Sequence, residues 1–202
     1  MAMIALAVGG AIAILAVIYF ANGGTSASSA SSGAYPFQVG APGAGTHAPA
    51  INLASTSGGT FQLGAQRGKS TLLFFQEGTG CEPCWTQIKD IEPQWSKFRA
   101  LGIVQLVTIT TNSLDQLKQK VADEQIRTPV LSDPDVSVSR AYNANQFGMM
   151  GDQMDGHSFV LVGRDGVIKW RADYGGSPKY IMYLPVSRLI ADIRKGLHGQ
   201  SA

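Results

Sequence analysis

The sequence has few cysteines and few charges, and each scarcity excludes a class of function. Its 202 residues include only two cysteines, Cys81 and Cys84, so a zinc site would lack soft ligands unless the three scattered histidines supplied them. Charged residues make up 15% of the chain, the formal net charge is +2, and no run of Lys or Arg occurs. A nucleic-acid-binding protein needs a basic patch, which this composition does not provide. The length fits one ordinary domain with appendages.

The N-terminal segment has no charged residue. Between Ala2 and Ala21 there is no Asp, Glu, Lys or Arg, and about 20 apolar residues span a hydrocarbon core. The alternative is a cleaved signal peptide, whose apolar region is usually shorter and preceded by Lys or Arg. We therefore predict a transmembrane anchor or signal segment at 1–21, with the anchor favoured. Because the first basic residue is Arg67, the positive-inside rule does not indicate its orientation.

Residues 22–49 also lack Lys, Arg, Asp and Glu, and they are rich in Gly, Ser, Ala and Pro. This composition is typical of a flexible linker. Its aromatic part, Tyr35 to Phe37, could dock on the domain that follows, which we place at 50–199.

The two cysteines lie between an apolar run and a helical pattern. Residues 71–75 are expected to form a buried strand, and apolar residues recur at helical spacing after Cys84. A cysteine at a helix N-terminus faces unpaired N–H groups and the positive end of the helix dipole, which stabilises its thiolate. Cys81 is therefore the predicted nucleophile, and Cys84 the resolving thiol that attacks the mixed disulfide. Two alternatives remain. The cysteines could bind a metal, or they could be packed inertly, since a disulfide that closes so short a loop stabilises little.

The remaining patterns alternate between strands and helices. Pro93 should kink the helix after the cysteines, and Ser113 with Gln116 forms a capping box that begins the next helix. The other expected elements are a hairpin of 51–53 with 60–63, strands at 103–110 and 130–131, a short helix at 136–142, a hairpin of 157–163 with 167–174, and a last helix at 186–195. This order predicts an α/β domain with a central mixed sheet and helices on both faces.

The order of elements resembles the thioredoxin fold. It is most similar to membrane-anchored thioredoxin-like reductases and to the peroxiredoxin-like branch, the alkyl hydroperoxide reductase/thiol-specific antioxidant family. The N-terminal hairpin, the run Thr79-Gly80-Cys81-Glu82-Pro83-Cys84 and the segment 157–166 carry the resemblance, which covers about 50–199. It implies a thioredoxin-like fold with an N-terminal hairpin extension, placed behind an N-terminal membrane anchor.

The resemblance also implies a function. The expected protein is a membrane-tethered, single-pass thiol–disulfide oxidoreductase whose redox domain lies on the extracytoplasmic side. Its expected partners are protein thiols and disulfides, together with an upstream thiol–disulfide electron donor or acceptor. No cofactor, metal or nucleic acid is implied. A non-catalytic scaffold that uses the same fold is an alternative of another class.

A peroxiredoxin-like thiol peroxidase is the first alternative. Its pattern, Pro-x-x-x-Thr-x-x-Cys with a partner arginine, is incomplete, because Thr79 is displaced by one position and the proline is missing. Gly156 stands where that arginine would be, and also where relatives often carry a cis-proline. We expect Gly156 to supply backbone freedom without the fixed geometry of proline.

Two further residues are candidate members of the catalytic site. Glu77, four residues before Cys81, could relay a proton, although it could also be a solvated loop carboxylate. His157 should bring an imidazole toward the sulfurs, where it would stabilise the thiolate if protonated or accept a thiol proton if neutral. Its alternative is a histidine on a strand edge, bonded to a backbone carbonyl. Trp85, directly after the pair, could line a partner groove.

A Cu(I)-binding chaperone is a further alternative, in which Met149, Met150, Met154 and His157 would assist the cysteine pair. Thioethers and thiolates are soft ligands that select Cu(I). Methionine-rich loops are more often adaptable apolar contacts, however.

Overall fold

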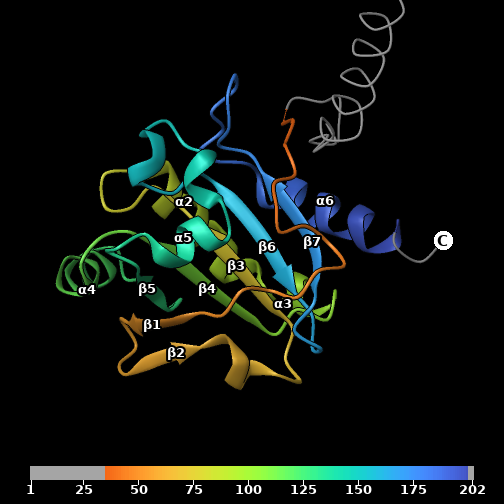
Figure 1. Ribbon diagram of the computed structural model, residues 1–202, viewed down its shortest axis with the longest axis horizontal. Coiled ribbons are helices and arrows are strands. Elements are labelled where there is room, and N and C mark those ends of the chain that lie inside the picture. Colours follow the sequence, from red (N-terminus) through yellow and green to blue (C-terminus); the bar gives the residue numbers. More distant parts are fainter. Residues whose placement is uncertain (1–34, 200–202) are drawn as a thin grey trace, which may run out of the picture.

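The computed structural model describes residues 35–199, so the predicted anchor and the first part of the predicted linker lie outside the described residues (Figure 1). Within residues 35–199, no helix is both long and apolar enough to cross a membrane. The elements in chain order are β1 (Asn52–Ser55), β2 (Thr60–Gln62), η1 (Leu63–Gln66), β3 (Thr71–Phe75), α2 (Glu82–Ile91), η2 (Glu92–Gln94), α3 (Trp95–Arg99), β4 (Gln105–Thr110), α4 (Leu114–Asp123), β5 (Val130–Ser132), α5 (Ser137–Ala141), η3 (Ala144–Gln146), η4 (Gly151–Gln153), β6 (Ser158–Val162), β7 (Ile168–Asp173) and α6 (Val186–His198).

The strands form one seven-stranded sheet in the order β2-β1-β5-β4-β3-β6-β7. Strands β3, β4 and β5 are parallel, whereas β6 pairs antiparallel with β3 and with β7, and β1 pairs antiparallel with β5 and with β2. The predicted mixed sheet, the N-terminal hairpin and the β6–β7 hairpin are therefore confirmed. The fold is thioredoxin-like.

Both faces of the sheet are covered, as predicted. One apolar core contains buried residues of α2, α4 and α6, and the other contains buried residues of α5 and the β1–β2 hairpin. Figure 1 shows α5 in front of the strands, on the face that this second core occupies. Strand β3 lies between the two cores, so all five of its residues are buried. A continuous apolar run is typical of such a central strand.

Local signals fix the helices that flank the sheet. Pro93 interrupts the helical run after the cysteines, because it lacks the N–H that would continue the hydrogen-bond ladder, and η2 separates α2 from α3 there. The capping box of Ser113 and Gln116 is present at the start of α4. Both predictions are confirmed.

The flexible-linker prediction is wrong for residues 35–49, which lie along β7. Gln38 exchanges two backbone hydrogen bonds with Asp173, at 2.9 and 2.8 Å, and Tyr35 and Phe37 pack against the first core. A fully buried ion pair fastens this segment: Arg171 binds the Asp173 carboxylate, which also accepts a hydrogen bond from the N–H of Gly40. The folded domain therefore includes residues from about 35 onward. The docking predicted for the aromatic part of the segment is confirmed.

Candidate functional site

The cysteine pair lies at the N-terminus of α2, just beyond the carboxyl end of β3. Cys81 occupies the N-cap position, and the N–H groups of Cys84 and Trp85 donate to its carbonyl. A disulfide joins Cys81 and Cys84. Cys81 is 8% exposed and Cys84 is fully buried, so solvent reaches the first cysteine alone. This is the arrangement in which the helix dipole stabilises the Cys81 thiolate once the disulfide is reduced.

The turn before Cys81 is held from three directions. Gly78 has φ of 100°, and its N–H donates to the Gln76 side chain at 2.6 Å. The indole N–H of Trp85 donates to the Gly78 carbonyl at 3.0 Å, and Asn112 accepts from the N–H of Thr79 at 2.9 Å. Trp85 is fully buried within the first apolar core, so the prediction that it lines a partner groove is wrong. A fixed turn keeps the Cys81 sulfur at the helix N-terminus.

Glu77 lies in this turn and is buried, not solvated. Its carboxylate accepts a hydrogen bond of 2.7 Å from the N–H of Met149. It therefore connects the cysteine turn to the loop of residues 143–156. Its predicted role as a proton relay stays a prediction.

His157 is fully buried and lies edge-on to the rings of Phe74 and Phe159. Neither ring nitrogen has a hydrogen-bond partner within residues 35–199. Because burial disfavours the charged imidazolium, the pKa of His157 falls from its usual 6.5 to about 3. The protonated form predicted to stabilise the thiolate is therefore not the form that this environment favours. The alternative, a hydrogen bond to a backbone carbonyl, is also not found in the part of the chain that the structure describes.

A buried neutral histidine makes stability depend on pH. Between pH 7 and pH 5 the unfolded chain takes up a proton at His157, whereas the folded chain does not, because its pKa is about 3. This residue should therefore cost the folded state roughly 2 kcal/mol as pH falls over that interval. We expect the free energy of unfolding of His157→Phe, measured with urea, to fall less between these pH values than that of the unaltered protein. An equal decrease in the free energy of unfolding for His157→Phe and the unaltered protein would contradict the account. The control, His47→Asn at an exposed site, should show the same decrease as the unaltered protein.

Gly156 precedes His157, and a close backbone approach, not a special φ, requires glycine there. A Cβ at this position would lie 1.3 Å from the carbonyl oxygen of Phe147 and 2.5 Å from the nitrogen of Gly148. The Phe147–Gly148 peptide thus packs directly on the Gly156 backbone. We predicted that Gly156 supplies backbone freedom in place of a cis-proline. The structure shows instead that glycine is needed because there is no room for a Cβ, and a proline ring would not fit either.

Asp155 was missed by the sequence analysis. It is fully buried, and neither carboxylate oxygen has a hydrogen-bond partner within the described residues. Burial raises its pKa well above the usual range, and the nearby Ser139 offsets this only in part. Burial thus favours the protonated, neutral form of the Asp155 carboxyl over its charged form. Nothing in its polar loop sequence distinguishes it from a solvated aspartate.

The structure places the residues of the copper alternative in different environments. Met149 and Met150 are 55% and 59% exposed, whereas His157 is fully buried. Within residues 35–199, no group of three or more His, Cys, Asp or Glu side chains is placed to hold a metal ion.

Comparison with known families shows to which family the chain belongs. Residues 44–171, more than half of the chain, match the model of the AhpC/TSA family. The chain belongs to the AhpC/TSA family. The resemblance inferred from the cysteine run and the β6 segment is therefore confirmed. No curated protein shows a significant sequence match to the chain.

Solved structures show the same fold at low sequence identity. AhpC of Enterococcus faecalis is 13% identical, with a TM-score of 0.64 and coverage of 78% of this chain and 94% of that one. The peroxidoxin BcpB of Mycobacterium tuberculosis is 15% identical, with a TM-score of 0.62 and coverage of 76% and 97%. A putative protein disulfide isomerase of Bacteroides thetaiotaomicron is 20% identical, with a TM-score of 0.56 and coverage of 80% and 92%. These structures support the fold alone.

Together, the AhpC/TSA membership and the Cys-x-x-Cys pair make the chain a thiol-based redox enzyme, either a thiol–disulfide oxidoreductase or a peroxiredoxin-like thiol peroxidase. The displaced threonine of the peroxidase pattern, Thr79, is engaged elsewhere. The Thr79 hydroxyl accepts a hydrogen bond from Asn112 at 3.1 Å.

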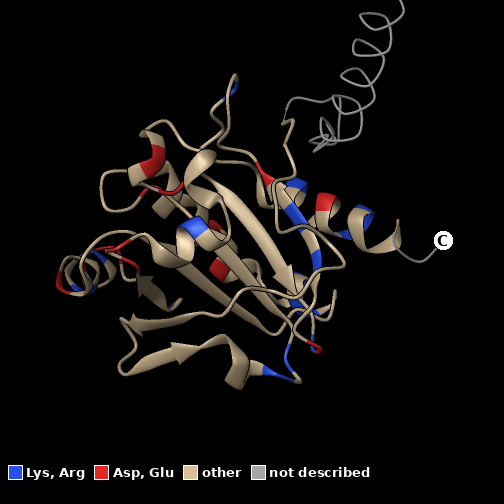
Figure 2. Cartoon of the chain, viewed as in Figure 1, with Lys and Arg blue, Asp and Glu red and all other residues tan. Residues whose placement is uncertain are grey.

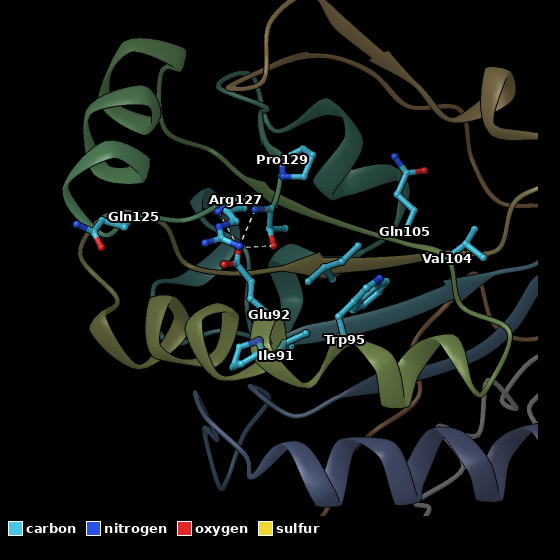
Figure 3. Close-up of a pocket in the computed structure, with 11 residues that line it drawn as sticks. Ile91, Glu92, Trp95, Val104, Gln105, Gln125, Arg127 and Pro129 are labelled. Atoms are coloured by element: carbon cyan, nitrogen blue, oxygen red, sulfur yellow. Dashed lines mark hydrogen bonds between the residues drawn. The ribbon is translucent and has the colours of Figure 1, made fainter.

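A cavity of about 520 Å³ lies away from the cysteine pair, where α2 meets α3 (Figure 3). Gln105, which lines it, pairs with Thr71 at the start of β3, whereas Cys81 follows the end of that strand. The cavity and the pair therefore lie toward opposite ends of the central strands. Its acidic residue, Glu92, is occupied by three hydrogen bonds from Arg127 and Thr128. None of the predicted site residues lines this cavity.

Proposed function

We propose that the chain is a membrane-tethered thiol–disulfide oxidoreductase that exchanges disulfides with protein partners outside the cytoplasm. The observation that carries the redox part is the cysteine pair at the N-terminus of α2, with Cys81 as the N-cap and Cys84 buried one turn further in. The tether and the location rest on the uncharged run from Ala2 to Ala21.

The proposed reaction transfers two electrons. The Cys81 thiolate attacks a disulfide of the partner, forming a mixed disulfide and releasing one partner thiolate, which takes up a proton. Cys84 loses its proton and attacks the Cys81 sulfur, so the second partner thiolate leaves and the Cys81–Cys84 disulfide forms. An upstream dithiol of a donor protein restores both thiols by the same two exchanges, and the reverse sequence oxidises a partner.

The test compares two oxidants on the reduced full-length chain. Peroxide would have to oxidise Cys81 to a sulfenic acid that Cys84 then condenses with, releasing water. We expect the reduced pair to react faster with the disulfides of insulin than with an equal concentration of hydrogen peroxide, because Thr79 is displaced from its position in the peroxidase pattern and Gly156 stands where the arginine would be. Oxidation of the pair, followed by thiol labelling and mass spectrometry, measures both rates. A faster reaction with peroxide would favour the peroxidase.

A further inference from the structure

Glu82, one of the two residues between the cysteines, belongs to an ion-pair network that joins α2 to α4. Glu82, Trp85 and Lys89 lie at spacings of three and seven residues, so they share one face of α2. Lys120 at the C-terminal part of α4 and Glu124 directly after α4 meet this face. Figure 2 shows acidic and basic residues interspersed on α4.

The network alternates charges. The Lys120 ammonium lies 3.3 Å from one Glu82 oxygen, and Lys89 lies 3.4 Å from the other. Glu124 binds both ammonium groups, at 2.7 Å from Lys89 and 2.5 Å from Lys120. The two lysines and two glutamates together are neutral. Lys120 also lies 5.6 Å from the centre of the Trp85 ring, and Trp85 holds the turn before Cys81.

Glu82 poses an electrostatic problem for the pair. It is the first residue of α2, so its carboxylate and the Cys81 thiolate occupy the same helix N-terminus. Two adjacent negative charges disfavour each other, which raises the pKa of the thiol. The ammonium groups of Lys120 and Lys89 face Glu82 and offset its charge, whereas Glu124 moderates both ammonium groups.

We propose that Lys120 and Glu124 are positioning residues that set the stability of the Cys81 thiolate, acting through Glu82. This inference rests on the proposed function, because it assigns the groups that tune the attacking thiol of the same pair. Lys120 stabilises the thiolate by offsetting Glu82, and Glu124 destabilises it by withdrawing positive charge from Glu82. Helix α4 thereby adjusts a reaction that takes place on α2.

The two residues should have opposite effects, which loss of structure would not produce. Lys120→Met leaves the network with an excess negative charge and should raise the Cys81 pKa. Glu124→Gln leaves an excess positive charge and should lower it. Over distances near a Debye length, each change should alter the thiolate fraction by about two- to fivefold. Lys118→Met is the matched control, because Lys118 lies on α4, is exposed and has no ion-pair partner among residues 35–199.

The experiment measures alkylation of Cys81 by uncharged iodoacetamide between pH 5 and pH 9, in the full chain with Cys84→Ser so that one thiol is present. We expect Lys120→Met to slow alkylation near pH 7, Glu124→Gln to accelerate it, Lys118→Met to leave it unchanged, and 1 M NaCl to reduce both shifts. Lys89→Met should act like Lys120→Met, so it substitutes for that variant if folding fails. Shifts in the same direction, or shifts no larger than that of Lys118→Met, would overturn the proposal.

This readout does not depend on turnover. A protein that fails to reduce disulfides while its variants show opposite shifts would contradict the proposed function and leave the network assignment standing. Unchanged pH profiles in a protein that does exchange disulfides would remove the network and leave the proposed function intact.

Discussion

Replacing Cys84 with serine should convert the protein from a catalyst into a trap, whereas replacing Cys81 should leave it inert. Cys81 is the less buried of the two cysteines and lies at the helix N-terminus, so it makes the first attack, and Cys84 is fully buried where it can reach the Cys81 sulfur. Cys84→Ser should therefore accumulate mixed disulfides that non-reducing electrophoresis resolves. Cys81→Ser should abolish disulfide reduction, because no thiolate is left at the helix N-terminus to make the first attack.

The pair of variants also identifies partners. Complexes captured by Cys84→Ser from the compartment in which the chain resides, then released by dithiothreitol and identified by mass spectrometry, should be proteins with reactive cysteines. The double variant with both cysteines replaced is the control and should capture none of them. Capture by Cys81→Ser equal to that by Cys84→Ser would contradict the assigned roles.

Replacing Gly156 with alanine should destabilise the domain by about 3 kcal/mol or more. The new Cβ would lie 1.3 Å from the backbone carbonyl oxygen of Phe147, and a Cβ is fixed to its own backbone, so no side-chain rotation relieves the clash. Urea unfolding of the full chain measures the change. Gly64→Ala is the control, because a Cβ there meets nothing within 4 Å and should change stability little. A loss below about 1 kcal/mol at Gly156 would show that the loop adjusts freely.

This loss of stability should extend to the site. The Phe147–Gly148 peptide packs on Gly156, and the next residue, Met149, donates to Glu77 in the cysteine turn. Moving this peptide should break the contact between the loop and the turn. We therefore expect Gly156→Ala to alter the alkylation rate of Cys81 even under conditions where the variant is fully folded.

The features that the sequence predicted correctly have local signals. The apolar run of β3, the cysteine turn, the break at Pro93 and the capping box of Ser113 each depend on residues within a few positions of one another. Propensity, capping and periodicity act at that range, so they identify the elements and place Cys81 at the start of a helix.

The features that the sequence did not predict depend on distant partners. Residues 35–49 have the composition of a linker, but they are held by Asp173 and Arg171, more than 100 positions away. His157 was expected beside the sulfurs as a titrating group, yet its burial between two aromatic rings decides its charge. Lys120 resembles any outward lysine until α2 and α4 are placed together. Tertiary contacts of this kind leave no local pattern.

A redox titration of the full-length chain in glutathione buffers tests the central claim most directly. At each potential, free thiols are blocked with maleimide and counted by mass. The account predicts a single two-electron transition between a form with two free thiols and the Cys81–Cys84 disulfide, reached equally from either side. A pair that stays in one state across the range, or that passes through a stable singly modified form in place of the disulfide, would contradict it.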